Sequence, residues 1–180
     1  MTKENFFKSI TQYIFLFFLA SFAGYVWEVL IFLIKDNSFC NRGFLYGPWL
    51  PIYGFGAVFF LLLLEKCKSH PIRVFFFSIL IGSLLELVIG FFLDKVWQLR
   101  YWDYSGYPMN LDGYICLYSM LGFGIGGLLW VCFLSYHALM LWERVPIPIQ
   151  HILLTILLLL LMTDWAAALI IPNVGDGVTF

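Results

Sequence analysis

Residues 149–171 read IQHILLTILLLLLMTDWAAALII and carry a single acidic side chain, Asp164. A helix needs about 20 mainly apolar residues to cross the hydrocarbon core of a bilayer, so this run can span it. Working outward along the chain, four further apolar runs are found, and the expected spans are residues 10–34, 51–64, 74–93, 115–141 and 149–171. We therefore expect an all-α polytopic membrane protein with about five transmembrane helices. Residues 1–180 are expected to form a single transmembrane domain, without room for an ATPase or kinase domain.

The composition supports this class of protein. Of the 180 residues, 62% are apolar and 12% are charged, whereas a soluble domain carries about 25% charged residues. So few charges are too few for the surface of a soluble domain or for a disordered chain. The formal net charge of −1 provides no basic patch for nucleic acid. The expected partner is the lipid bilayer, and no nucleic acid is expected.

The basic residues predict the orientation, because Lys and Arg are enriched in cytoplasmic loops. With the N-terminus inside, the inner segments hold six basic residues and the outer segments four. The inner ones are Lys3, Lys8, Lys66, Lys68, Arg73 and Arg144, and the outer ones are Lys35, Arg42, Lys95 and Arg100. We expect the N-terminus inside and the C-terminus outside. The first apolar run is longer than the core of a signal peptide, which predicts an uncleaved span.

This orientation places residues 35–50 and 94–114 outside. Both segments are rich in Gly, Pro and aromatic residues, which indicates re-entrant or interfacial loops and not flexible linkers. The stretch 41–56, NRGFLYGPWLPIYGFG, contains four glycines and two prolines. It predicts either a broken helix whose free backbone groups line a site or a turn followed by a helix that starts at Pro51.

A short pattern occurs twice. Gly24 precedes Glu28 by four positions in the first span, and Gly82 precedes Glu86 by four positions in the third. Each span is followed by an outer segment that contains Asn, Gly and an aromatic residue: Asn41-Arg42-Gly43-Phe44 and Asn110-Leu111-Asp112-Gly113-Tyr114. The pattern predicts two parallel two-helix repeats plus one helix. The alternative is that Asn caps and Gly turns arose independently at two helix starts.

Three acids interrupt the apolar spans, namely Glu28, Glu86 and Asp164. A charged side chain inside the membrane is unfavourable and usually faces the bundle interior with a partner. At about 1.5 Å per residue, all three lie roughly 9–11 Å below the outer edge of their spans. The acids therefore predict one polar site, open to the outer face, for a cation, a proton or a positively charged group. The alternative is neutralisation of each acid by loop amides or by Arg42 and Arg100.

Further candidates for substrate binding lie near these acids in the sequence: Trp27, Asn41, Arg42, Asp103 and Asn110. Arg42 retains its charge and would either pair with an acid or hold an anion such as a lipid phosphate. Trp102-Asp103-Tyr104 fits an aromatic and acidic clamp, or an interfacial anchor in which the Asp forms a turn.

Metal and cofactor sites are not expected. Cys40, Cys67, Cys116 and Cys132 do not have the spacing of zinc ligands, and the three histidines are far apart in the sequence. No catalytic residue is assigned, because the chain has no nucleophile elbow. Pairing of Cys40 with Cys116 in a disulfide is left open.

The residues quoted above resemble a known family. The pattern Gly-x-x-Trp-Glu, then Asn-Arg-Gly-Phe-Leu-x-Gly-Pro-x-x-Pro-Ile-Tyr-Gly-x-Gly, then Trp-Asp-Tyr and Asn-x-x-Gly-x-Ile is similar to that of the CmpB-like membrane proteins, labelled ABC-transporter type IV. The resemblance covers roughly residues 15–130 and implies a permease-like protein, which we expect in a bacterial cytoplasmic membrane. Asp164 lies beyond the resemblance.

These observations favour a transporter or permease-like protein, with a separate ATPase subunit or a second copy of the chain as candidate partners. Two other functions stay open. One is an intramembrane enzyme that modifies a lipid with paired carboxylates and an arginine, although the chain lacks a metal motif. The other is a sensor or assembly subunit in which the acids join helices.

Overall fold

The computed structural model describes residues 3–37 and 39–173, and their side chains from Ile10 onward except at positions 35 and 36. The described chain is mainly helical, and an isolated antiparallel bridge pairs Leu111 with Ile115. The predicted all-α polytopic class is confirmed. The side chains of Lys3, Lys8 and Lys35, which entered the orientation argument, lie outside the described residues.

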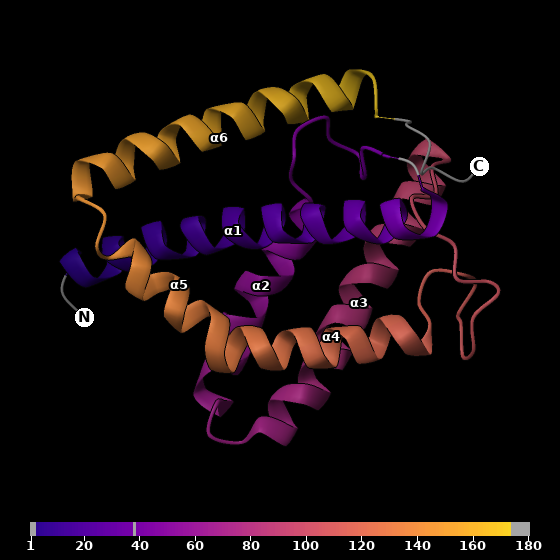
Figure 1. The fold of residues 1–180 in the computed structure, drawn as a ribbon, viewed down its shortest axis with the longest axis horizontal. Helices are drawn as coiled ribbons and strands as arrows, with labels where there is room; N and C mark the ends of the chain where they lie inside the picture. Colours follow the sequence, from indigo (N-terminus) through magenta and orange to yellow (C-terminus); the bar gives the residue numbers. More distant parts are fainter. Residues whose placement is uncertain (1–2, 38, 174–180) are drawn as a thin grey trace.

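The helices follow one another along the chain as shown in Figure 1. They are α1 (Lys3–Asp36), α2 (Pro51–Leu64), the 3₁₀ turn η1 (Glu65–Cys67), α3 (Pro71–Trp97), α4 (Leu117–Leu129), the π-helical turn η2 (Trp130–Leu134), α5 (Ser135–Trp142) and α6 (Ile147–Ile170). Four stretches are long and apolar enough to cross a membrane: Ile10–Ile34, Pro71–Trp97, Leu117–Trp142 and Ile147–Ile170.

The second expected span is shorter than a membrane-crossing helix. Helix α2 has 14 residues and is about 21 Å long, whereas the hydrocarbon core is about 30 Å thick. The number of long spans in the described chain is thus four, and α2 is an additional, short helix. Pro51 starts α2, because a proline at the first helical position lacks only an amide that would be unpaired there.

The segment before α2 turns back into the bundle. The backbone amide of Leu50 donates a 3.0 Å hydrogen bond to the carbonyl of Ser21, near the middle of α1. Figure 1 shows this segment returning from the far end of α1 to a point between α1 and α6 before α2 begins. Residues 39–50 are called the re-entrant segment below.

Helices α1 and α2 pack on each other, and so do α3 and α4. In Figure 1, α6 runs alongside α1 on one side of the molecule, and α4 lies on the opposite side. These pairings bring the two Glu-bearing helices, α1 and α3, into one bundle. A buried apolar cluster joins α1, α2, α3 and η2 through Leu16, Phe60, Leu61, Leu64, Val74 and Val131.

Close packing at glycine is the same in both helix pairs. A Cβ atom on Gly24 of α1 would overlap the ring of Tyr53 on α2. A Cβ atom on Gly82 of α3 would overlap the ring of Phe123 on α4. Only glycine allows these rings to lie against the helix backbone.

A second pair of contacts repeats the first. Gly54 of α2 lies against Phe17 of α1, and Gly124 of α4 lies against Phe75 of α3. Phe17 and Gly24 in the first helix pair correspond to Phe75 and Gly82 in the second, because the separation in sequence is the same for both residues. Tyr53 and Gly54 correspond to Phe123 and Gly124 in the same way, with a different separation. Spacing of this regularity favours two structural repeats over chance likeness of helix starts.

The turns before α2 and α4 also correspond. Gly43 and Gly113 are separated by the same offset as Gly54 and Gly124, and their φ values are +91° and +75°. They are the glycines with positive φ in the described chain. Glycine adopts this conformation without the steric penalty that a Cβ atom brings, so both loops turn at an equivalent glycine.

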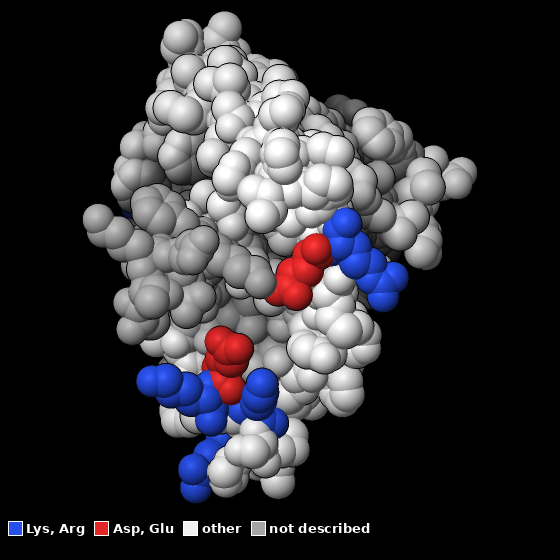
Figure 2. Space-filling model, turned by 90° about the vertical axis from the view of Figure 1, so that its left-hand side faces the viewer, with Lys and Arg blue, Asp and Glu red and all other residues white. Residues whose placement is uncertain are grey.

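The first half of α1, η1 and the α5–α6 turn lie at one end of the molecule. Gln12 of α1 donates a hydrogen bond to Glu143, which directly follows α5. Figure 2 looks onto this end, where acidic and basic side chains lie next to each other and the surrounding helix surfaces are uncharged. The loops that precede α2 and α4 lie toward the other end (Figure 1).

Candidate functional site

Glu28 lies on α1, one helical turn after Gly24. Because Gly24 lets the ring of Tyr53 pack against α1, the Tyr53 hydroxyl reaches Glu28 and donates a 2.6 Å hydrogen bond to Oε1. The Nε atom of Arg42 lies 3.6 Å from Oε2 of the same carboxylate. The side chain of Glu28 remains 26% exposed. Glu28 is thus held by a hydroxyl from α2 and a cation from the re-entrant segment.

Glu86 lies on α3, one helical turn after Gly82, and is 7% exposed. The hydroxyl of Tyr104, from the second outer loop, donates a 3.1 Å hydrogen bond to Oε1. Ser119 near the start of α4 also lies against this carboxyl group. Oε2 is buried and has no hydrogen-bond partner among the described residues. The two glutamates therefore have different surroundings.

The four oxygen-bearing side chains form one group inside the bundle. Glu28 interacts electrostatically with Glu86, and both interact with the hydroxyls of Tyr53 and Tyr104. The members come from α1, α2, α3 and the second outer loop. Glu28, Tyr53, Glu86 and Tyr104 are called the carboxylate cluster below. The sequence predicted one depth for Glu28 and Glu86, and the structure brings them together.

Arg42 is buried and has contacts on several sides. Besides the ion pair with Glu28, its Nη2 donates a 2.7 Å hydrogen bond to the carbonyl of Tyr101, and its guanidinium lies 4.3 Å from the centre of the Phe32 ring. The structure thus supports the pairing alternative for Arg42. Arg100, the other arginine considered, contacts Asp94 and Asp103 in the second outer loop region.

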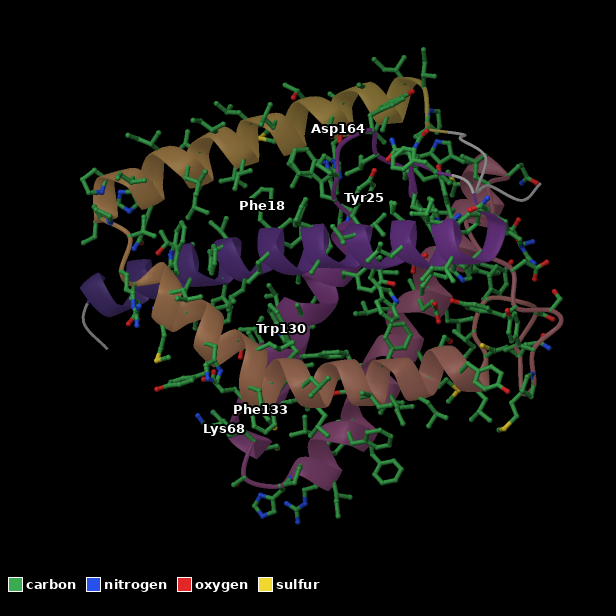
Figure 3. All side chains as sticks on the ribbon, in the orientation of Figure 1. Phe18, Tyr25, Lys68, Trp130, Phe133 and Asp164 are labelled. Carbon is green, nitrogen blue, oxygen red and sulfur yellow. The ribbon has the colours of Figure 1, made fainter. Side chains whose placement is uncertain are left out.

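Asp164 lies apart from the carboxylate cluster. Its carboxylate accepts hydrogen bonds from the backbone amides of Tyr46 and Gly47, at 3.0 and 2.9 Å, and from the indole nitrogen of Trp49, at 2.7 Å. Figure 3 shows Asp164 between α6 and α1, beside the re-entrant segment. The expectation that three acids share one site is corrected, because loop amides satisfy Asp164. Equal depth in a bundle does not imply the same side of it.

Asn41 and Trp27 do not face the cluster as expected for ligand-binding side chains. Asn41 accepts a 2.9 Å hydrogen bond from Tyr25 and donates one of 3.0 Å to the carbonyl of Tyr46. These bonds shape the re-entrant segment. Trp27 is 59% exposed on the outer surface of α1, where a membrane would contact it.

Asp103 and Asn110 fold the second outer loop. Asp103 accepts hydrogen bonds from the hydroxyl and the amide of Ser105, which lower the pKa of its carboxyl group. Asn110 donates to the carbonyls of Ser105 and Tyr107. The hydroxyl of Tyr104, by contrast, points inward to Glu86, and burial is the main cause that raises its pKa. The Trp102-Asp103-Tyr104 motif thus contributes its tyrosine to the cluster.

Three residues that contact the site or its loops, Tyr53, Tyr104 and Asn173, were not among the candidate binding residues, although Tyr53 and Tyr104 belong to motifs quoted above. Tyr53 and Tyr104 supply the hydroxyls of the cluster. Asn173 donates to the carbonyls of Asn41, Gly43 and Leu45, and its own carbonyl accepts from Tyr101. Asn173 therefore ties the end of the described chain to both outer loops. Tyrosines in the Gly-rich and Trp-rich outer segments were the available signal for the first two.

The two best-formed hollows in the described part of the molecule are not lined by Glu28 or Glu86. The larger, with a volume of about 450 Å³, lies against the outer half of α3 and is bordered mainly by apolar side chains such as Phe91, Phe92 and Leu111. The described residues contain no group of three His, Cys, Asp or Glu side chains that could hold a metal ion. Cys40 and Cys116 are both buried and are free thiols.

Comparison with known proteins gives one family. Residues 15–169 match the family described as "Putative ABC-transporter type IV", which extends the resemblance seen in the sequence through α6 and Asp164. No curated protein and no solved structure matches the chain. The match covers most of the chain and includes every helix that contributes to the carboxylate cluster, so this protein belongs to the family "Putative ABC-transporter type IV".

Proposed function

We propose that this protein is a permease-like transport component that binds a positive charge at Glu28 and Glu86, from the outer side of the membrane. The observation that carries the proposal is the imbalance of charge in the cluster. Two carboxyl groups lie together, and Arg42 pairs with Glu28. Glu86 has no cationic partner among the described side chains, although it is buried.

A buried polar group without a partner is unfavourable, and a buried charge is more so. Such a group is retained in membrane helices mainly where it serves an ion, a proton or a substrate. The tyrosines of the cluster suit the same ligand class, because aromatic faces and hydroxyl oxygens both attract cations. These features support a cationic ligand over an anionic one.

Access from the outer side is supported by the position of the cluster. Tyr104 belongs to the second outer loop, and Glu28 remains partly exposed next to the re-entrant segment. The opposite end, with η1 and the α5–α6 turn, presents short charged loops. A separate ATPase subunit would dock on those loops if ATP hydrolysis drives transport.

The test is equilibrium binding of two small cations, rubidium and tetramethylammonium, to the full chain in lipid vesicles. We expect saturable binding by the wild type and at least about tenfold weaker binding by E86Q, because its amide has no charge to pair with a cation. The matched control is E65Q at the inner end, which should bind like the wild type. Equal binding by wild type and E86Q, or none by the wild type, would overturn the proposal.

A further inference from the structure

The two oxygens of Glu86 are arranged like those of a protonated carboxyl group. Oε1 accepts the hydrogen bond from Tyr104, as the carbonyl oxygen of a neutral acid would. Oε2 is buried and accepts no hydrogen bond from the described residues. An ionised carboxylate would offer two equivalent acceptors, of which one would be left without a donor.

Among the described residues, none of the groups that face Glu86 from the packed elements carries a positive charge. They are Glu28 from α1, Tyr53 from α2, Tyr104 from the loop, and Ser119 from α4. Arg42 of the re-entrant segment pairs with Glu28. Ionised Glu86 would be a second negative charge beside Glu28 inside a low-dielectric bundle, which is electrostatically unfavourable.

A resident metal ion is a poor alternative to a proton. Hard cations take six or more oxygen ligands at about 2.0–2.6 Å and therefore need a cavity. The described side chains form no metal-binding group, and the best-formed hollows lie elsewhere. A proton needs one lone pair and no cavity. Glu86 can therefore hold a proton as long as no larger cation has entered the carboxylate cluster and widened it.

We propose that Glu86 carries one exchangeable proton on Oε2, and that a cation reaching the cluster displaces this proton to the outer aqueous phase. This inference rests on the proposed function and names its coupling ion. The step breaks the O–H bond at Oε2, leaves the electron pair on the carboxylate and releases the proton to water. The reverse step forms the O–H bond again when the cation leaves.

Tyr104 has a place in this step as a positioning residue. Its pKa is raised by burial and by the nearby acids, so its phenol remains a hydrogen-bond donor at neutral pH. It holds Oε1 and leaves Oε2 for the proton. Its ring also packs edge-on against Tyr107, which is exposed in the outer loop. Tyr104 and Tyr107 therefore form a chain of contacts from Glu86 to the exposed surface of the loop.

The direct test is infrared spectroscopy of the full chain in vesicles, with the carboxyl carbons of glutamate labelled with carbon-13. We expect a band from a protonated glutamic acid at neutral pH in the wild type, in E28Q and in the inner-end control E65Q. The band should be lost in E86Q, and in E86D it should be replaced by a band from an unlabelled aspartic acid, because position 86 retains an acid. An unchanged band in E86Q, or no band in the wild type, would overturn the proposal.

The second measurement is proton release on addition of rubidium or tetramethylammonium, followed with a pH-sensitive dye in weakly buffered vesicles. We expect about one proton released for each cation bound by the wild type and none by E86Q. Cation binding without proton release would refute the proton on Glu86 and leave the proposed function standing. A glutamic acid band at Glu86 without cation binding would refute the proposed function instead.

Discussion

The α1–α2 half and the α3–α4 half of this protein share the same packing scheme, but the acid in each half has different partners. In both halves a glycine packs against an aromatic ring and a tyrosine hydroxyl reaches a glutamate. In the first half Arg42 neutralises Glu28, whereas in the second half Glu86 is buried without a cation from the described residues. The comparison teaches that the repeated packing brings an acid into each half, and that a single loop residue, Arg42, determines which of the two acids has a cationic partner among the described residues.

The largest expected effect comes from removing the cation of the first half. R42M leaves Glu28 as an uncompensated acid in the bundle, which should lower the free energy of unfolding in detergent by about 3–5 kcal/mol. The measurement is denaturant unfolding followed by tryptophan fluorescence. The double variant E28Q/R42M should recover much of the loss. A loss in R42M that E28Q does not reduce would show that the ion pair is not its cause.

The glycine contacts should respond alike in the two halves. G24A and G82A each place a methyl group in overlap with an aromatic ring, and overpacking of this kind lowers stability by about 1–3 kcal/mol. Both variants are measured by the same unfolding assay. G56A is the matched control, because a Cβ atom there would meet no atom within 4 Å. A large loss in one half only would argue against equivalent repeats.

The re-entrant segment distinguishes the first half, and Asp164 anchors it. D164N replaces a charged acceptor of three hydrogen bonds with an amide, so the segment should open more often. Cys40, which is 2% exposed, reports this opening through its reaction with a maleimide in a background without the other cysteines. We expect labelling about tenfold faster, which corresponds to about 1.4 kcal/mol. T163A, whose hydroxyl bonds only within α6 in the described chain, should label at the wild-type rate.

A smaller change in the free energy of unfolding is expected when Glu86, the acid of the second half, is replaced. If Glu86 is neutral as proposed, E86Q replaces it with an amide that still accepts the hydrogen bond from Tyr104, so the free energy of unfolding should change by less than about 1 kcal/mol. This contrasts with the effect of R42M in the same assay. A loss as large as that of R42M would mean that Glu86 is ionised and paired, and the asymmetry between the halves would disappear.

The smallest effect concerns the pH dependence of the second outer loop. Hydrogen bonds from Ser105 lower the pKa of Asp103 in the folded protein. Asp103 therefore stabilises the fold above its unfolded pKa of about 3.9, and this contribution is lost as pH falls through the lower, folded value. S105A should make stability less dependent on pH below about 4. D103N should remove this component, and an unchanged acid profile in S105A would contradict the assignment.

Several features of the site could be predicted because they depend on local sequence. Glu28 and Glu86 were identified as interior because an acid in an apolar span is unfavourable in lipid. The turn glycines Gly43 and Gly113 were identified by their place in a repeated pattern, and both have positive φ. The length of α2 was harder to predict, since an apolar run of 14 residues does not show whether the extended segment before it lies inside the membrane.

The partners of the acids could not be predicted from sequence. Asp164 has the same expected depth and chemistry as Glu86, yet it binds amides of a segment that is far from it in the chain. Tyr104 reaches Glu86 because the loop around Asp103 and Asn110 folds inward. The sequence alone determined a membrane bundle with rare interior acids, since transfer of side chains into lipid depends on residue type. Only the tertiary structure decided which acid meets Arg42 and which meets the Tyr104 hydroxyl, because these contacts depend on how distant segments pack.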